Sequence, residues 1–86
     1  MTEKAIVIGA SSGIGEALVR RLAEEGYEVG LAARSLDRLE TIAGELPTPS
    51  YVARMDVTET ESARDSFREL AEAMGSVDVV VVNAGI

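Results

Sequence analysis

The sequence predicts an α/β fold, in which helices cover both faces of a parallel β-sheet. Short apolar runs alternate with segments of helical periodicity along the 86 residues. Apolar residues make up 47% of the chain and aromatic residues only 3%, which suits a core of Ala, Val, Leu and Ile in a parallel sheet. The connections are short, so right-handed crossovers are expected. We therefore expect one small domain, residues 1–86, with the element order β-α-β-α-β-α-β.

The first half of the chain predicts two strands and two helices. Residues 5–8 are a short apolar run that ends at a glycine, as in a strand buried on both faces. From Ser12 onward apolar residues recur at helical spacing, and Gly26 follows the last of them as a stop signal. Residues 29–33 indicate a second strand, and Ser35 is a candidate N-cap for a second helix.

The second half predicts two more strands around a third helix. Pro47 and Pro49 exclude a helix and bracket a turn, after which residues 51–55 indicate the third strand. The Thr-x-x-Glu pattern of residues 58–61 predicts a capping box at the start of an amphipathic helix. Residues 77–82 are a run rich in valine, which favours a fourth strand covered on both faces.

Composition excludes several classes of function. Fifteen acidic and eight basic residues give a formal net charge of -7, which repels nucleic acids and anionic membrane surfaces. The chain has no cysteine and no histidine, so we expect no disulfide and no metal site, and a cytoplasmic protein. We also expect no membrane span, because no apolar run approaches roughly 18 residues, and no signal peptide, because the start of the chain, residues 1–4, lacks the charged segment and long apolar run of one.

The stretch IGASSGIG stands between the first strand and the first helix. A helix N-terminus presents unpaired N–H groups and the positive end of its dipole, so it can hold a phosphate without a basic side chain. A Cβ at Gly9 or Gly13 would keep the phosphate away, while Gly15 would let the first helical turn lie tight against the strand. Ser11 and Ser12 offer hydroxyls that either cap the helix or bind phosphate oxygens.

Two alternatives to a dinucleotide site concern the same stretch. A glycine-rich turn with no ligand would have the same composition. A P-loop would need Gly-Lys-Ser/Thr at the helix start, but Gly15 is followed by Glu16, a carboxylate where a triphosphate requires a cation. The spacing Gly-x-x-x-Gly-x-Gly also differs from the common Gly-x-Gly-x-x-Gly pattern.

Three motifs together resemble the short-chain dehydrogenase/reductase family: GASSGIG at residues 9–15, Asp56-Val57 after the third strand and Asn83-Ala84-Gly85 after the fourth. The resemblance extends over the whole chain. It implies one half of a doubly wound, Rossmann-type fold with strand order 3-2-1-4, whose switch point lies between the first and fourth strands.

The resemblance also implies a role for each motif. The Asp56 carboxylate would accept a hydrogen bond from the adenine amino group, with Val57 beside it. Asn83, Ala84 and Gly85 would pass beside the adenine-side ribose. The residues placed along the pyrophosphate and its neighbouring ribose would be Gly9, Ser11, Gly13, Ile14 and Gly15. Taken alone, Asp56 is also compatible with a carboxylate at a strand end or in a turn, and Asn83-Ala84-Gly85 with an ordinary turn.

One position departs from the family pattern. Members usually have a threonine just before the first glycine, where this sequence has Ile8. The hydroxyl link that this threonine would make to the region of Asn83 is therefore expected to be absent.

Arg34 predicts the identity of the cofactor. An acid at the end of the second strand accepts a hydrogen bond from the ribose 2′-hydroxyl and selects NAD. Arg34 can instead bind a 2′-phosphate through its forked guanidinium, with help from the Ser35 hydroxyl. We therefore expect NADP(H), with NAD(H) as the alternative. The competing interpretation is that Arg34 forms a surface ion pair with Asp37 or Glu28.

The catalytic residues of the family are not found in the chain. Its chemistry uses a Tyr-x-x-x-Lys pair with a serine, but Tyr27 and Tyr51 are not followed by such a lysine, and Lys4 precedes both. We expect both tyrosines to be partly buried packing residues. We expect the cofactor-binding part of an oxidoreductase that transfers hydride between NADP(H) and an alcohol or carbonyl substrate, inactive by itself. The alternative is a short non-enzymatic dinucleotide-binding or interaction module.

The fourth strand also predicts self-association. The sequence supplies no fifth strand to cover its far edge. We expect a homo-oligomer with this strand at or near the contact, unless helices and loops of the same chain shield it.

Overall fold

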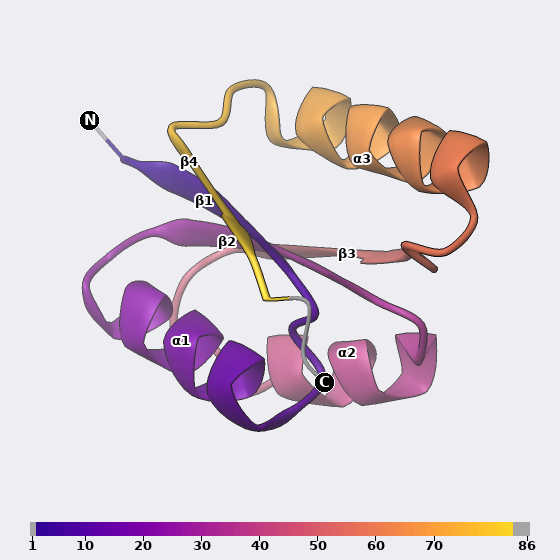
Figure 1. Ribbon diagram of the computed structural model, residues 1–86. Coiled ribbons are helices and arrows are strands. Elements are labelled where there is room, and N and C mark those ends of the chain that lie inside the picture. Colours follow the sequence, from indigo (N-terminus) through magenta and orange to yellow (C-terminus); the bar gives the residue numbers. More distant parts are fainter. Residues whose placement is uncertain (1, 84–86) are drawn as a thin grey trace.

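A computed structural model describes residues 2–83 of the chain. Within this range every expected strand and helix is present and in the expected order (Figure 1). The elements are β1 (Lys4–Ile8), α1 (Gly13–Glu24), β2 (Glu28–Ala33), α2 (Leu36–Ala43), β3 (Ser50–Arg54), α3 (Thr60–Met74) and β4 (Val79–Val82).

The four strands form one parallel sheet in the order β3-β2-β1-β4, which confirms the predicted topology. In its register, Ile8 at the end of β1 lies between Ala32 of β2 and Val82 of β4. Helices α1 and α2 lie on one face of the sheet and α3 on the other (Figure 1). The carboxyl ends of all four strands therefore meet at one edge, with the switch point between β1 and β4.

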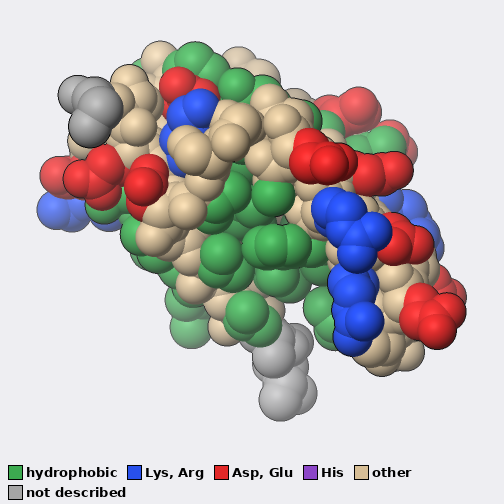
Figure 2. Space-filling model, turned by 90° about the horizontal axis from the view of Figure 1, so that it is seen from above, with side chains coloured by type: hydrophobic (Ala, Val, Ile, Leu, Met, Phe, Trp, Pro, Cys, Tyr) green, Lys and Arg blue, Asp and Glu red, His purple; other side chains and the backbone are tan. Residues whose placement is uncertain are grey.

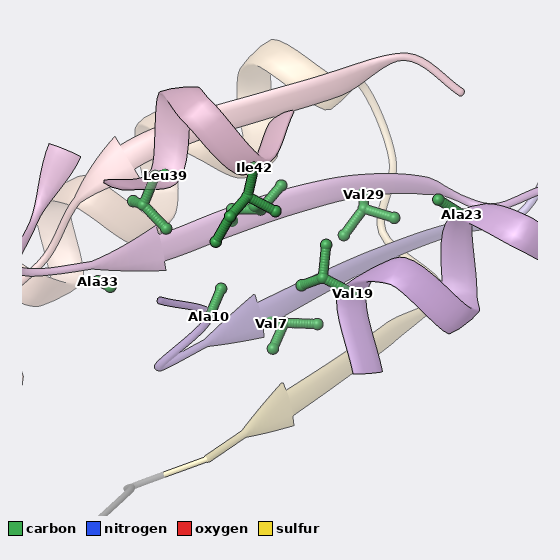
Figure 3. Close-up of a cluster of buried hydrophobic side chains, with 9 residues drawn as sticks. Val7, Ala10, Val19, Ala23, Val29, Ala33, Leu39 and Ile42 are labelled. Atoms are coloured by element: carbon green, nitrogen blue, oxygen red, sulfur yellow. The ribbon is translucent and has the colours of Figure 1, made fainter. Parts of the chain in front are cut away.

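Two apolar clusters hold the helices against the sheet. On the α1 and α2 face, Val7 and Leu31 from the strands pack with Val19 of α1 and with residues of α2 (Figure 3). On the α3 face, Ile6 packs with Leu70 and other side chains of α3 and β3's end. Most of these residues are fully buried, so the sheet is a rigid support for the loops at its carboxyl edge.

The predicted capping box at the start of α3 is wrong. The helix begins at Thr60, and its N-cap, Glu59, makes no side-chain hydrogen bond to the helix. The Thr58 hydroxyl donates instead to Asp56 Oδ1, at 2.6 Å. Threonine readily makes such local bonds outside a helix, and the nearby carboxylate is a stronger acceptor for its hydroxyl.

The expectation that β4 is covered on both faces is also wrong for the described residues. Val79, Val80 and Val82 are 38%, 45% and 65% exposed. Helix α3 packs on β2 and β3, and α1 packs on β1 and β2, so neither helix reaches far enough to cover β4. The strand pairs with β1 alone within residues 2–83.

Lys4 ties together the amino-terminal edge of the sheet. Its Nζ donates to the carbonyl of Met74 at the end of α3, at 2.5 Å, and lies 3.9 Å from Glu28 Oε1. Its backbone N–H donates to Asp78 Oδ2 at 2.8 Å. A cation at a helix C-terminus is favourable because of the helix dipole, so the single lysine of the chain stabilises the end of the sheet opposite the glycine turn. In the described part of the chain, no helix is both long and apolar enough to cross a membrane.

Candidate dinucleotide-binding site

A groove of about 530 Å³ opens at the carboxyl edge of the sheet, where all four strands end. Eight of the predicted site residues line it: Gly9, Ser11, Ser12, Arg34, Ser35, Asp56, Val57 and Asn83. Three more residues line it that were not predicted as site residues: Ile8, Ala33 and Thr58. Gly13, Ile14 and Gly15 follow the glycine turn at the start of α1 and do not line the groove. Ala84 and Gly85 lie outside the described residues.

The glycine turn is packed tightly against the end of β4. Gly9 has φ +86°, and a Cβ built on it would lie 2.0 Å from the backbone oxygen of Asn83. A Cβ on Gly15 would lie 2.0 Å from the backbone oxygen of Gly9. Gly15 thus lets the first turn of α1 lie tight against the strand end, as expected. The sequence predicts that Gly9 lacks a side chain to make room for a phosphate, and this reason needs correction. The space that a Cβ would take at Gly9 is occupied by the backbone of Asn83.

Within the glycine turn, Gly13 faces open space. Its φ is +25°, and a Cβ placed on it would have no other atom within 4 Å. Packing within the described chain therefore gives no reason for a residue without a side chain here. The positive φ itself favours glycine here, and the open space leaves room for a ligand group at the helix N-terminus.

The N-terminus of α1 keeps its polar groups available. Ser12 is the N-cap, but its hydroxyl makes no capping hydrogen bond, so of the two uses expected for it only ligand binding remains open. The N–H groups of the first helical turn have no partner within the helix. Ile14, in the same turn, is 79% exposed. The site can thus offer hydrogen-bond donors and the positive end of the dipole to an anion.

Glu16 is the carboxylate nearest to this helix start, and two arginines neutralise it. Its Oε2 accepts from Arg20 at 2.9 Å, and its Oε1 accepts from Arg38 of α2 at 2.5 Å. The hydrogen bond from Arg20, with the charge of Arg38, lowers the pKa of the Glu16 carboxyl. The negative charge that argued against a triphosphate is therefore compensated locally, and it opposes an anion at the glycine turn less than the sequence suggests.

Arg34 is exposed at the end of β2 and forms no ion pair within residues 2–83. The competing pairings with Glu28 and Asp37 are not formed: Glu28 is 3.9 Å from Lys4 and accepts a hydrogen bond from Tyr51. Ser35 is the N-cap of α2 and, like Ser12, makes no side-chain capping bond. A guanidinium, a hydroxyl and a helix N-terminus thus stand together without partners on one side of the groove.

Asp56 is held in place through one of its two oxygens. Its Oδ1 accepts from the backbone N–H of Thr58 at 3.0 Å and from the Thr58 hydroxyl at 2.6 Å. These bonds lower the pKa of the Asp56 carboxyl, and the charges of Arg34 and Arg54 lower it further. Oδ2 accepts no hydrogen bond from the described residues, so an ionised, oriented carboxylate oxygen is available to a donor in the groove. Val57, next to it, is 56% exposed.

Thr58 is the positioning residue that sequence reasoning missed. The pattern Asp-x-Thr is the signal that could have revealed it, because an aspartate commonly accepts hydrogen bonds from the residue two positions on. The capping-box pattern, which includes the same threonine, concealed it.

Asn83 connects the glycine turn to β4 in spite of Ile8. Its backbone N–H donates to Ile8 O at 2.8 Å, and its side-chain Nδ2 donates to Gly9 O at 3.4 Å. Two bonds from the asparagine thus join the glycine turn to the end of β4 without a hydroxyl at position 8. These two bonds hold the glycine turn against the end of β4 at the switch point between β1 and β4.

Neither tyrosine contributes to the groove. Tyr27 and Tyr51 are half-buried and pack against the two apolar clusters, which confirms their expected role in packing. The nearby Glu3 carboxylate raises the pKa of Tyr27, and burial raises the pKa of Tyr51. Both changes disfavour the tyrosinate form. Among the described residues, no group of three or more His, Cys, Asp or Glu could hold a metal ion.

Comparison with known proteins agrees with this geometry. A family model described as short chain dehydrogenase matches residues 3–86. An uncharacterized oxidoreductase of Staphylococcus epidermidis is 41% identical over 81 residues, which are 94% of this chain and 35% of that protein.

Two solved structures are similar as well. An alcohol dehydrogenase from Thermococcus sibiricus, complexed with 5-hydroxy-NADP, has a TM-score of 0.87 at 42% identity, covering 93% of this chain and 36% of that one. A 3-ketoacyl-(acyl-carrier-protein) reductase from Brucella melitensis, complexed with NADH, has a TM-score of 0.82 at 26% identity, covering 91% and 32%. The chain thus spans about a third of the length of the relatives it matches. From the family match over nearly all of its residues, the chain belongs to the short-chain dehydrogenase family.

Proposed function

We propose that the groove binds a nicotinamide dinucleotide, and that the chain is the cofactor-binding part of an oxidoreductase. The observation that carries this proposal is the convergence of eight predicted residues, from the ends of all four strands, on one groove. The similar structures complexed with 5-hydroxy-NADP and with NADH support a cofactor of this class.

The described residues fit the adenine half and the pyrophosphate of such a cofactor. The N-terminus of α1, with Gly13 and the free Ser12 hydroxyl, would hold the pyrophosphate. Arg34 and Ser35 would meet the adenine ribose. Asp56 Oδ2 would accept from the adenine amino group, with the exposed Val57 against the ring. The bound cofactor would supply the hydride chemistry, and the residues of this chain would bind and orient it.

We propose further that the preferred cofactor is NADP(H). Arg34 has no ion-pair partner within residues 2–83, and Ser35 makes no capping bond. A 2′-phosphate would supply the missing anion, whereas a 2′-hydroxyl would leave the guanidinium unpaired. A charge-assisted hydrogen bond contributes roughly 1.5–3 kcal/mol, so we expect NADP to bind about 10- to 100-fold more tightly than NAD.

Calorimetric titration of NADP and NAD into the 86-residue chain tests this preference. Arg34→Asp should remove or reverse it. Arg64→Asp, at an exposed position on α3 that does not line the groove, is the matched control with the same charge change and should retain it. Equal or tighter binding of NAD by the unaltered chain would refute the role of Arg34. Absence of binding by both cofactors would refute the dinucleotide site itself.

The reaction of the longer enzyme would be hydride transfer between the cofactor and an alcohol or carbonyl compound. The similar structures are an alcohol dehydrogenase and a ketoacyl reductase. We expect the 86-residue chain alone to bind without turnover, because neither tyrosine is followed by the family's lysine or lies in the groove. NADPH oxidation above a protein-free control, with a panel of ketones and aldehydes, would contradict this expectation.

A non-enzymatic dinucleotide-binding module is the second candidate, and the same absence of catalytic residues favours it. We expect a cytoplasmic protein in either case, on the grounds of its lack of cysteine and its acidic surface. We also propose that the chain self-associates, with β4 at the contact, because this strand is the least covered part of the sheet.

A further inference from the structure

A row of alternating charges joins α1 to α2 on the face of the sheet that these two helices share (Figure 1). Glu16 Oε1 accepts from Arg38 of α2 at 2.5 Å, and Glu16 Oε2 accepts from Arg20 at 2.9 Å. Arg20 also donates to Glu45 Oε1, at 2.7 Å. Arg38 stands in the first turn of α2, and Glu45 follows Gly44, the C-cap of that helix. The row therefore connects both ends of α2 to α1.

The other ion pairs of the helices do not bridge two elements. Figure 2 shows acidic and basic side chains close together over α3, but the ion pair there, between Asp65 and Arg68 at 3.7 Å, lies within that helix. On α1, Arg21 pairs at 3.2 Å with Glu25, the C-cap of the same helix. Among residues 2–83, only the row through Glu16 joins two helices by ion pairs.

The ion pair between Glu16 and Arg38 lies one helical turn away from the start of each helix. Glu16 comes three residues after Gly13, the first residue of α1, and Arg38 three residues after Ser35, the N-cap of α2. Residues three apart are neighbours on the same side of a helix. Neither charged side chain lines the groove. The pair thus connects, from outside the groove, the two helix starts at which we propose that the pyrophosphate and the 2′-phosphate bind.

The first turn of α2 has little apolar packing to hold it in place. The helix has only eight residues, and a helix this short depends on tertiary contacts. Its buried side chains, Leu39 and Ile42, both come after the first turn, whereas Leu36, Asp37 and Arg38 are all exposed. Helix α2 packs on β2 and β3, and α1 packs on β1 and β2. The ion pair from Arg38 is therefore the contact that relates the start of α2 to the start of α1.

We propose that Glu16 and Arg38 are positioning residues for the cofactor. Their ion pair holds Arg34 and Ser35 at the spacing from Gly13 that the 2′-phosphate and the pyrophosphate of NADP(H) require. A site that is already held in its bound geometry binds more tightly, because less motion is lost on binding. This inference rests on the proposed function and deepens it, since it concerns the same groove.

Removing both charges of the pair tests this role without changing the net charge of the chain. Glu16→Gln/Arg38→Gln loses the bridge between the helices, while the formal net charge stays at -7. From the strength of an exposed ion pair, we expect this double variant to bind NADP about two- to fivefold more weakly in a calorimetric titration. Arg21→Gln/Glu25→Gln is the matched control, because it removes an ion pair that does not reach α2. It should bind NADP as the unaltered chain does.

Adenosine 2′-monophosphate separates positioning from direct contact with the phosphate. This probe has the adenine and the 2′-phosphate but no pyrophosphate, so it needs only the α2 side of the groove. We expect Glu16→Gln/Arg38→Gln to bind the probe as tightly as the unaltered chain does. Urea denaturation of both double variants should show that each is folded under the conditions of the titration.

The outcomes that contradict the inference differ from those that contradict the site. An equal loss of affinity for the probe and for NADP would show that Arg38 meets the phosphate itself, and would overturn the positioning role. Unchanged NADP binding by Glu16→Gln/Arg38→Gln would overturn it as well, and would leave the pair a role in stability alone. Absence of NADP binding by the unaltered chain would overturn the proposed function, and this inference with it.

Discussion

Replacing Gly9 by alanine should disrupt the junction between the glycine turn and β4. The new Cβ would start 2.0 Å from the backbone oxygen of Asn83 and 3.1 Å from its carbonyl carbon. Carbon and oxygen atoms in favourable contact are separated by about 3.3 Å, so the two segments would have to move apart by about 1.3 Å. That movement would strain the bond from Asn83 N–H to Ile8 O.

The expected loss of stability follows from these two effects. Gly9 has φ +86°, a region that costs a residue with a side chain roughly 1–2 kcal/mol. Loss of the bond at Asn83 adds about 1 kcal/mol. Together they lower the free energy of unfolding by about 2–3 kcal/mol, which is a large part of the stability of a chain this small.

Urea denaturation followed by circular dichroism measures this loss. Gly26→Ala is the matched control, because Gly26 has φ +96° but a Cβ there would meet no other atom within 4 Å. It should cost only the backbone strain, about 1–2 kcal/mol. Equal losses for Gly9→Ala and Gly26→Ala would refute the close contact with Asn83.

Three further changes have expected outcomes. Lys4→Met should lower the urea midpoint, since it removes the cation that donates to the end of α3; an unchanged midpoint would show that this contact contributes nothing. Because the folded-state pKa of Glu16 is lowered, its contribution is fully present above the unfolded pKa of about 4.3 and is lost as the pH falls through the lower folded value. The urea concentration at half unfolding should therefore decrease when the pH is lowered below about 4, and it should decrease less in Glu16→Gln. An equal decrease in both proteins would contradict the stabilising role of the Glu16 carboxylate. Tyr27 and Tyr51 should both ionise above the ordinary tyrosine pKa in an absorbance titration, and ionisation of either at the ordinary value would contradict the environment described for it.

Most of the fold could be predicted from the sequence because local signals agree with the tertiary structure. The run before Gly9 and the valines of residues 79–82 are strands, and the alternation of strands and helices leads to the observed strand order. The start of α3 was mispredicted because the hydroxyl of Thr58 has a competing acceptor, Asp56, which pattern reasoning on the helix does not consider. The exposure of β4 depends on how far the helices extend across the sheet, which no local pattern specifies.

The site could be predicted for the same reason, but not in its details. Motifs that follow successive parallel strands must meet at one edge of the sheet, so the sequence predicts that Arg34, Asp56 and Asn83 share one site, and all three line the groove. Sequence spacing does not show what lies against a glycine, so the contact of Gly9 with Asn83 was missed. Nor does it show that Asn83 bonds both to Ile8 O and to Gly9 O.

The most direct test of the dinucleotide site is a titration of NADPH into the isotopically labelled chain, followed through its backbone amide resonances. We expect shifts that saturate together at Gly13, at Arg34 and Ser35, and at Val57, three places that only a ligand extended along the groove would affect at once. The exposed face of α3, for example at Ala73, should not change. No saturable shift at these positions, or shifts confined to α3, would contradict the proposed site.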